Sequence, residues 1–276
     1  MPEHPKKLLQ RFGLEARKSL GQNFLLPGAG ERIARAARIK AGDAVLEIGP
    51  GLGALTEALL DLDARVVAVD LDETMLRILR ELYGDRKNLE LVHGDARDFD
   101  IGAVAARMGK LKLVGNLPYY ASSPILRRAV DERAHLLSAT FTLQKEVADR
   151  IAAGPGSKTY GSLSVLIGLY ADASVPLKLP PGAFHPQPGV ESAVLHLVFR
   201  EKPRAEVADF PHFEKIVFAA FSHRRKTILN SMKDALEIDG PAILAALGRA
   251  GIDPQRRAET VSVEEFARLA AEVPHA

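Results

Sequence analysis

The sequence predicts an α/β protein, with a doubly wound parallel sheet followed by a small helical domain, and three observations support this fold class. First, strand-like apolar runs alternate with stretches of helical spacing from about residue 30 to residue 170, the pattern of a parallel sheet with helices on both faces. Second, a glycine-rich turn, GPGLG (49–53), connects one such strand to a helix. Third, the pattern becomes helical from about Asp209 onward.

The first two strand–helix units of the predicted sheet are regular. The apolar runs AVLEIG (44–49) and RVVAVD (65–70) are expected to be strands. Each precedes a segment with apolar residues at every third or fourth position, ALTEALL (54–60) and ETMLRILREL (73–82), and this spacing predicts helices. Three further strands are expected in LELVHGD (89–95), KLKLVGN (110–116) and LLSATFTLQ (136–144). In this architecture ligands bind beyond the carboxyl ends of the strands.

The second half of the chain predicts a change of architecture. The glycine-rich segment 152–162 is expected to be a mobile surface loop. Residues 176–199 predict two antiparallel strands joined by a Pro-rich turn. Because the later pattern is helical, with glycine and proline breaks, we place a domain boundary near Pro203. The expected domains are a catalytic domain, residues 1–203, and a helical domain, residues 204–276.

Composition and charge exclude several classes of function. The absence of cysteine excludes disulfides, cysteine metal sites and thiol catalysis. No apolar run approaches the roughly 18–20 residues of a membrane span, and no secretion signal is recognisable, so we expect a cytoplasmic protein. The net charge is only +2, but residues 1–40 carry nine bases and three acids, and five bases without an acid lie between Lys215 and Lys233. These segments predict contact with a polyanion, or are solvated helix faces.

The glycine-rich turn predicts that a ligand approaches the backbone. Gly49, Gly51 and Gly53 permit a tight turn of this kind, which is compatible with a dinucleotide, a phosphate or S-adenosylmethionine. The spacing is GxGxG rather than GxGxxG, and no Gly-Lys-Ser/Thr sequence follows. The first difference argues against a dinucleotide, and the second excludes a P-loop.

Acidic residues end the next two predicted strands. Asp70 is placed to accept hydrogen bonds from both hydroxyls of a ribose, and Asp95 from an adenine amino group. Such acids suit a cationic sulfonium and would repel a pyrophosphate, so S-adenosylmethionine is the expected cofactor. The alternative for either acid alone is that it merely caps the following helix.

The fourth predicted strand ends in Asn116-Leu117-Pro118-Tyr119, which matches a pattern of methyltransferases acting on exocyclic amino groups. Such a nitrogen is a poor nucleophile because its lone pair is delocalised into the ring. The Asn116 side-chain carbonyl and the Leu117 main-chain carbonyl are predicted to accept its N–H bonds and to stabilise the developing positive charge. Pro118 restricts the turn, and Tyr119 is predicted to stack on the base. Phe184 is a candidate for the other face of the base, or a core residue.

Six segments resemble, in order, signatures of the small-subunit ribosomal RNA adenine N6-dimethyltransferases (KsgA/RsmA), and the resemblance covers nearly the whole chain. They are RKSLGQNFL (17–25), LEIGPGLGALT (46–56), GNLPY (115–119), LQKEVADRI (143–151), FHPQPGVESAV (184–194) and FSHRRKTILNSM (221–232). The resemblance implies a Rossmann-like class I methyltransferase fold and dimethylation, at N6, of two adjacent adenosines near the 3′ end of 16S rRNA. It implies the small ribosomal subunit as partner and RNA or ribosome binding by the C-terminal domain. We expect a monomer that does not bind membranes.

The same resemblance assigns roles to individual residues. Those implied to bind S-adenosylmethionine are Gln22, Asn23, Leu25, Gly49, Gly51, Asp70, Asp95, Ala96 and Asn116. Of these, Gly49 would approach the methionine portion, and Asn116 would lie between the cofactor and the target amine. Contacts with RNA phosphates are implied for the run Arg224, Arg225 and Lys226. No metal site is expected.

Two departures and three alternative functions remain open. The family often has Glu where Asp70 stands, and Asn-Ile-Ser-Thr-Pro where this chain reads YASSP (120–124). A large-subunit rRNA adenine dimethyltransferase of the antibiotic-resistance type would share the pocket, but usually has Ile in place of Leu117. A DNA adenine methyltransferase typically has Pro there. A ribosome-assembly factor that acts by binding alone would not need the intact Asn116 motif.

Overall fold

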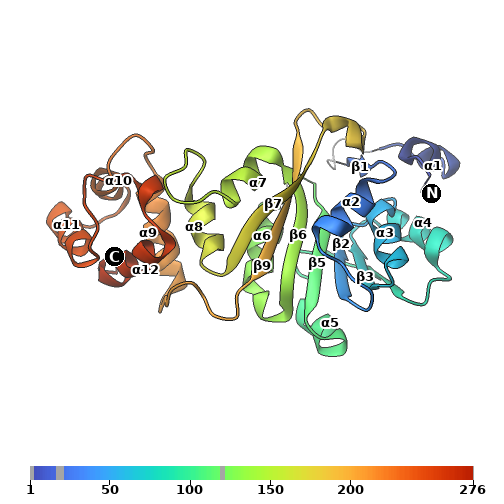
Figure 1. Cartoon of the computed structure of the whole chain (residues 1–276), viewed down its shortest axis with the longest axis horizontal. Helices are drawn as coiled ribbons and strands as arrows, with labels where there is room; N and C mark the ends of the chain where they lie inside the picture. Colours follow the sequence, from blue (N-terminus) through green and yellow to red (C-terminus); the bar gives the residue numbers. More distant parts are fainter. Residues whose placement is uncertain (1–2, 17–21, 119–121, 276) are drawn as a thin grey trace. The chain divides into compact units, whose positions relative to one another are not determined.

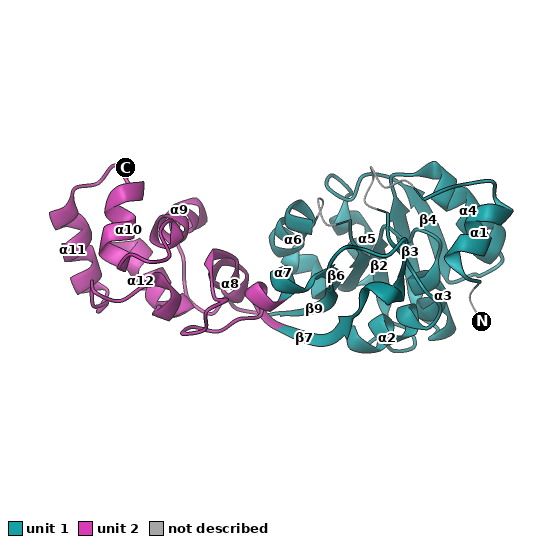
Figure 2. Ribbon diagram, turned by 90° about the horizontal axis from the view of Figure 1, so that it is seen from above, with its two compact units in different colours: residues 1–148, 174–199 teal, residues 149–173, 200–276 magenta. Residues whose placement is uncertain are grey.

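The computed structural model describes residues 3–16, 22–118 and 122–275, and the chain divides into two compact units (Figures 1 and 2). The first unit comprises residues 1–148 and 174–199, and the second comprises residues 149–173 and 200–276. Within the described ranges, none of the helices combines the length and the apolar character that a membrane crossing requires.

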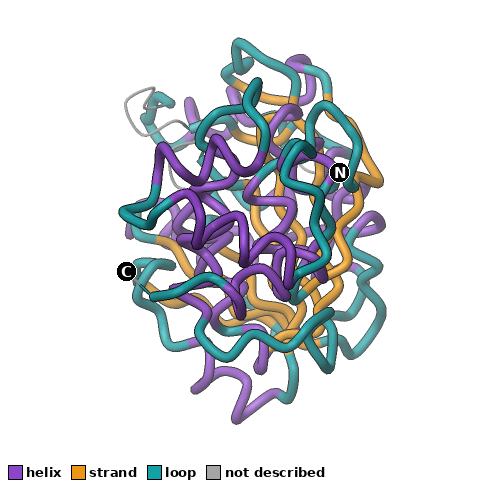
Figure 3. Tube along the Cα trace, turned by 90° about the vertical axis from the view of Figure 1, so that its left-hand side faces the viewer, coloured by secondary structure: helices purple, strands orange, loops and turns teal. Residues whose placement is uncertain are grey.

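A seven-stranded sheet forms the centre of the first unit and is coloured orange in Figure 3. Its strands are β2 (Ala44–Ile48), β3 (Arg65–Asp70), β4 (Leu89–His93), β5 (Leu111–Asn116), β6 (Leu136–Gln144), β7 (Ala171–Leu179) and β9 (Ser192–Phe199). They follow the order β4-β3-β2-β5-β6-β9-β7. Neighbours from β4 to β6 are parallel, and β9 runs antiparallel to β6. The predicted doubly wound sheet is therefore confirmed, and its strand order reverses between β2 and β5, where such sheets bind ligands.

The helices of the first unit alternate with the strands as the periodicity predicts. They are α2 (Ala29–Ala36), α3 (Ala54–Asp61), α4 (Glu73–Tyr83), α5 (Ile101–Met108) and α6 (Ser122–Asp131), followed by α7 (Lys145–Ile151), which runs into the second unit. In Figure 2, α2 and α3 lie on one side of the sheet and α6 on the other. Helix α4 begins where the Asp72 carboxylate accepts the N–H of Thr74, a normal N-cap. Its apolar face buries Met75, Leu76 and Leu79.

A short second sheet joins the N-terminal segment to the Pro-rich connection between β7 and β9. Strand β1 (Phe24–Leu25) pairs antiparallel with β8 (Phe184–His185), so that Leu25 lies opposite Phe184. Strands β9 and β7 are sheet neighbours, as predicted, but their connection contains β8 and a 3₁₀ turn at Pro181–Ala183 rather than a simple turn. A two-residue strand shows no alternation that a sequence pattern could reveal.

Helix α1 (Pro5–Arg11) adds an apolar cluster to the first unit. It buries Leu8 and Leu9, and these side chains pack with Phe24, Leu52 and Met75 in one cluster. Burying a leucine side chain stabilises a fold by roughly 1.5–3 kcal/mol. The N-terminal helix is therefore an integral part of the first unit and packs against Phe24 of β1.

The second unit is built from α8 (Ser162–Gly168), α9 (Phe210–Phe221), α10 (Ile228–Ala235), α11 (Gly240–Arg249) and α12 (Val263–Glu272). Its core combines the C-terminal helices with residues of segment 149–173, including Tyr160 and Val165. The N–H of Gly156 also donates to the carbonyl of Glu259. The division of the chain into units therefore differs from the expected single domain boundary near Pro203. Segment 149–173 has an apolar face that is buried only with the later helices, and the expected surface loop contains a buried tyrosine, 2% exposed.

Candidate active site

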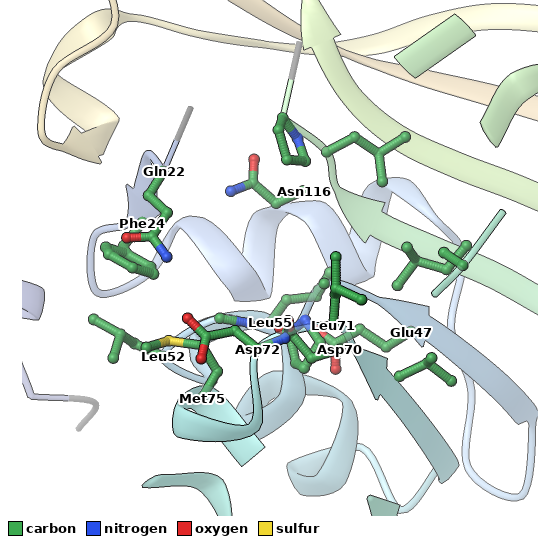
Figure 4. A pocket seen from close by; sticks show the side chains of 18 of the residues that line it. Gln22, Phe24, Glu47, Leu52, Leu55, Asp70, Leu71, Asp72, Met75 and Asn116 are labelled. Carbon is green, nitrogen blue, oxygen red and sulfur yellow. Dashed lines mark hydrogen bonds between the residues drawn. The ribbon is translucent and has the colours of Figure 1, made fainter. Parts of the chain in front are cut away.

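A cavity of about 530 Å³ lies in the first unit at the carboxyl ends of β2, β3 and β5 (Figure 4). It is lined by every described residue that the sequence assigned to the cofactor or to catalysis. These are Gln22, Asn23, Leu25, Gly49, Gly51, Asp70, Asp95, Ala96, Asn116, Leu117, Pro118 and Phe184. Tyr119 lies outside the described residues, as do Tyr120 and Ala121. The placement brings the predicted set together, while the roles of its members remain predictions.

The glycine-rich turn after β2 presents bare backbone to the cavity. Gly49 and Gly51 both have left-handed backbone angles, with φ of +65° and +56°, which side-chain-bearing residues rarely adopt. A Cβ at Gly51 would lie 3.1 Å from the ring of Phe24, whereas the space next to Gly49 is open. The turn therefore leaves room for a ligand to lie directly against the main chain at Gly49.

The Asp70 carboxylate is held in place at the end of β3. Its Oδ1 accepts the N–H of Asp72 at 2.9 Å, and its Oδ2 accepts the N–H of Gly51 at 3.4 Å. Burial raises the pKa of Asp70, and the hydrogen bonds oppose that shift. Helix α4 is capped by Asp72 and not by Asp70. Capping of α4 therefore does not explain Asp70, whose carboxylate lies in the lining of the cavity.

Asp95 is less free than the sequence suggested. Its two carboxylate oxygens accept from the Nε and a terminal nitrogen of Arg97 at 2.5–3.0 Å. These bonds lower the pKa of Asp95. An adenine amino group would therefore share this carboxylate with Arg97, which also lines the cavity. The sequence offered a signal, because Arg97 follows Asp95 by only two positions, but we did not assign it a role.

Glu47 is a cavity residue that sequence reasoning did not assign. It is 1% exposed, and its Oε2 accepts the hydroxyl of Thr56 at 2.7 Å. Burial raises the pKa of Glu47 to about 8, although the Thr56 hydrogen bond opposes the shift. The carboxyl is therefore largely neutral in the ligand-free protein near pH 7, and a cationic ligand in the cavity would favour its ionised form.

Glu47→Gln should flatten the pH dependence of stability of the ligand-free protein. The pKa of Glu47 is raised from its ordinary 4.5 to about 8, so its contribution is full below pH 4.5 and is lost as the pH rises through 8. A tenfold difference in proton affinity between the folded and unfolded states corresponds to about 1.4 kcal/mol. Urea unfolding at pH 5, 6.5 and 8 should show a fall in the free energy of unfolding that the variant largely lacks.

Glu31→Gln is a matched control, because Glu31 is an exposed carboxylate of the same unit. It should reproduce the wild-type pH profile of unfolding. If wild type and Glu47→Gln gave parallel profiles between pH 5 and 8, Glu47 would not hold its proton as inferred.

Asn116 ends β5 with its amide fixed in orientation. Its Nδ2 donates to the main-chain carbonyl of Asn23 at 2.9 Å, and Figure 4 shows the amide nitrogen pointing toward the segment that carries Gln22 and Phe24. The Oδ1 therefore points the other way, as an acceptor. Sequence reasoning gave Asn23 a cofactor contact and missed this positioning contact. Phe184, predicted to face a base, is 3% exposed and also belongs to an apolar core cluster.

The predicted RNA-binding run lies in the second unit. Arg224, Arg225 and Lys226 are exposed and occupy the turn between α9 and α10, rather than a helix. A terminal nitrogen of Arg224 donates to the carbonyl of Lys158 at 2.5 Å. The ammonium of Lys226 pairs with the carboxylate of Asp234. These partners occupy part of the donor capacity of the run.

The doubly wound sheet, its glycine-rich turn and the cavity beside them define a class I S-adenosylmethionine-dependent methyltransferase. The family profile described as "Ribosomal RNA adenine dimethylase" matches residues 13–274. The chain therefore belongs to the ribosomal RNA adenine dimethylase family, and the resemblance inferred from its six segments is confirmed.

Relatives and solved structures agree with this family. The chain is 46% identical over 271 residues to ribosomal RNA small subunit methyltransferase A of Myxococcus xanthus, covering 97% of this chain and 94% of that protein. The protein of the same name from Moorella thermoacetica is 42% identical over 283 residues, covering 99% and 98%. A dimethyladenosine transferase from Plasmodium falciparum superposes with a TM-score of 0.72 at 26% identity, covering 89% and 95%. The 23S rRNA methyltransferase ErmE gives 0.69 at 27% identity, covering 91% and 99%.

Proposed function

We propose that this enzyme dimethylates N6 of two adjacent adenosines near the 3′ end of small-subunit (16S) rRNA, during assembly of that subunit. The observation that carries the proposal is the fixed amide of Asn116 at the cavity wall, with its Nδ2 bound to the Asn23 carbonyl. The small-subunit methyltransferases among the relatives, which match nearly end to end, favour this substrate over large-subunit RNA.

The residues of the cavity fit S-adenosylmethionine, which supplies an electrophilic methyl group on a cationic sulfonium. Gly49 offers an open approach to the backbone, and the Asp70 carboxylate is held where it can accept from a ribose. Leu52, Leu71 and Met75 add apolar lining. The buried carboxyl of Glu47 lies in the same wall and favours a cation there.

The Asn116 motif would make the target nitrogen a better nucleophile. The Oδ1 of Asn116 and the carbonyl of Leu117 would accept hydrogen bonds from the two N–H groups of the amine. These bonds draw the lone pair of the nitrogen out of the ring and stabilise the positive charge that develops on it. Leu117 is 4% exposed and lines the cavity with Pro118. Phe184, and Tyr119 outside the described residues, are the candidates for stacking on an extruded base.

Mass spectrometry of methylated RNA tests this proposal. Small ribosomal particles and protein-free large-subunit RNA are incubated separately with the enzyme and isotopically labelled S-adenosylmethionine. We expect N6,N6-dimethyladenosine at two neighbouring positions of the small-subunit RNA and none in the large. Labelling of large-subunit RNA alone would support the antibiotic-resistance type of activity. Tight particle binding without any transfer would support an assembly factor that acts by binding.

Replacing Arg224, Arg225 and Lys226 together with Ala should weaken rRNA binding and flatten its salt dependence. The logarithm of the binding constant falls as the logarithm of the salt concentration rises, and each lost phosphate contact reduces the steepness of this fall by about 0.9. Arg225 alone should account for much of the change, because Arg224 and Lys226 already have protein partners. Filter binding at several salt concentrations measures the slope.

Arg86→Ala serves as the control for charge loss, because Arg86 is an exposed, ion-paired arginine of the first unit. It should leave the slope close to that of wild type. A triple variant with an unchanged slope would mean that the run does not contact phosphates.

We further propose that the enzyme is a cytoplasmic monomer, that its partner is the small ribosomal subunit, and that residues 204–276 bind RNA or the ribosome. Light scattering at micromolar concentration tests the monomer directly, since a dimer would double the measured mass.

A further inference from the structure

Helix α9 carries an aromatic side chain that its own unit does not bury. Phe218 is 49% exposed, whereas Phe213, Ile216 and Val217 of the same helix are fully buried in the core of the second unit. A single exposed apolar residue is common on protein surfaces and has no meaning alone. The exposed residues around Phe218 indicate what kind of partner its side chain could contact.

The exposed neighbours of Phe218 are polar or basic. Lys215 lies one turn earlier on the same face of α9, and Ser222 is the exposed residue one turn later. The basic turn begins at Arg224, no more than about 13 Å from Phe218 between Cα atoms, from helical rise and chain length. From Lys215 to Lys233 the chain holds five basic residues and no acid. Asp234 beyond them is paired with Lys226.

A second segment joins this surface. The bond from Arg224 to the main-chain carbonyl of Lys158 fixes the loop before α8 against the turn. The side chain of Lys158 is exposed. An aromatic ring is thus flanked along the chain by Lys215 and Arg225, and the adjoining loop adds Lys158. Interleaved basic and aromatic side chains are the composition of surfaces that bind unpaired nucleic acid.

We propose that Phe218 stacks on an unpaired base of the rRNA while Lys215 and Arg225 contact the flanking phosphates. The inference rests on the proposed rRNA substrate and adds a base contact outside the active site. Every base offers a π face, so stacking needs no particular sequence, but it requires a base that is not enclosed in a duplex. A protein partner would favour apolar neighbours around the ring. The exposed residues one turn away from Phe218 are instead Lys215 and Ser222, and the half-buried Glu214 and Phe221 lie beside them.

Binding measurements on Phe218 variants of the full chain test the proposal. The probes are protein-free small-subunit rRNA and a fully paired RNA duplex of about 20 base pairs. Phe218→Ala should bind the rRNA roughly fivefold to a hundredfold more weakly and bind the duplex as wild type does. Phe218→Leu, which keeps an apolar side chain without a π face, should lose as much. Phe218→Trp should bind like wild type, and the salt slope should not change in any of them.

Several results would overturn the proposal. Unchanged rRNA affinity of Phe218→Ala, or an equal loss on the duplex, would show that no unpaired base is stacked. A loss on assembled small particles but not on protein-free rRNA would assign Phe218 to a ribosomal protein. Thermal unfolding and calorimetric binding of S-adenosylmethionine show that each variant is folded. If wild type itself neither bound nor methylated the rRNA, the proposed function would fail rather than the role of Phe218.

Discussion

Asn116→Ala should slow methyl transfer by a factor of about 10² to 10³, while the affinity for the small ribosomal subunit stays nearly unchanged. The expected size follows from the loss of one pre-oriented partner of a charge that develops in the transition state. Asn116 lines the cavity of the first unit, whereas the basic run belongs to the second. Single-turnover methylation with labelled cofactor gives the rate, and co-sedimentation with the particle gives the affinity.

Two further variants separate chemistry from structure. Asn116→Asp keeps an acceptor but replaces the donor that bonds the Asn23 carbonyl, so it should also be slow, because two oxygens would face each other. Asn88→Ala is the matched control, since the Asn88 amide donates to the Ala64 carbonyl at 2.9 Å and does not line the cavity. It should keep its rate. If Asn116→Ala lost particle binding as much as rate, the residue would be structural.

Asp70→Ala should raise the dissociation constant for S-adenosylmethionine roughly tenfold to a hundredfold, the value of hydrogen bonds to a charged group. Part of the effect comes from the ribose that loses its acceptor. Another part comes from the N–H groups of Gly51 and Asp72, which lose theirs, so that the glycine-rich turn is less fixed. Isothermal titration calorimetry of the purified protein measures the constant.

Asp70→Glu and Asp100→Ala are the conservative variant and the control for this measurement. The glutamate keeps the carboxylate and should restore most of the affinity. Asp100 caps α5 by accepting the N–H of Ala103 and does not line the cavity, so its loss should lower stability by about 1 kcal/mol without weakening cofactor binding. Wild-type affinity in Asp70→Ala would remove Asp70 from the ribose site.

Much of the fold was predictable because its signals are local. The five parallel strands are recognisable in the sequence as apolar runs, and the glycine-rich turn indicates the first strand-to-helix connection. By contrast, the pairing of β1 with β8 joins residues about 160 positions apart through two-residue strands. Neither a periodicity nor a turn signal specifies such a contact, although it places Phe184 opposite Leu25, a predicted cofactor residue.

The candidate site was predictable as a set of residues but not as a set of contacts. Motif spacing pointed to Asp70, Asp95 and Asn116, and all three line one cavity. The partners that decide their availability come from elsewhere or were overlooked: the Asn23 carbonyl holds Asn116, and Arg97 holds Asp95. Burial of Glu47 depends on how α3 closes over β2, which single-sequence patterns do not fix.

The chain passes from one unit to the other three times, after Ala148, Ala173 and Phe199. The helical unit thus consists of an internal segment, residues 149–173, and a C-terminal segment, residues 200–276, which share one core. Residues 200–276 alone would lack the side chains of α8 that fill part of this core. Loss of the C-terminal segment would likewise leave the internal segment without a core. A substitution in the shared core that lies in one segment therefore changes the packing of the other.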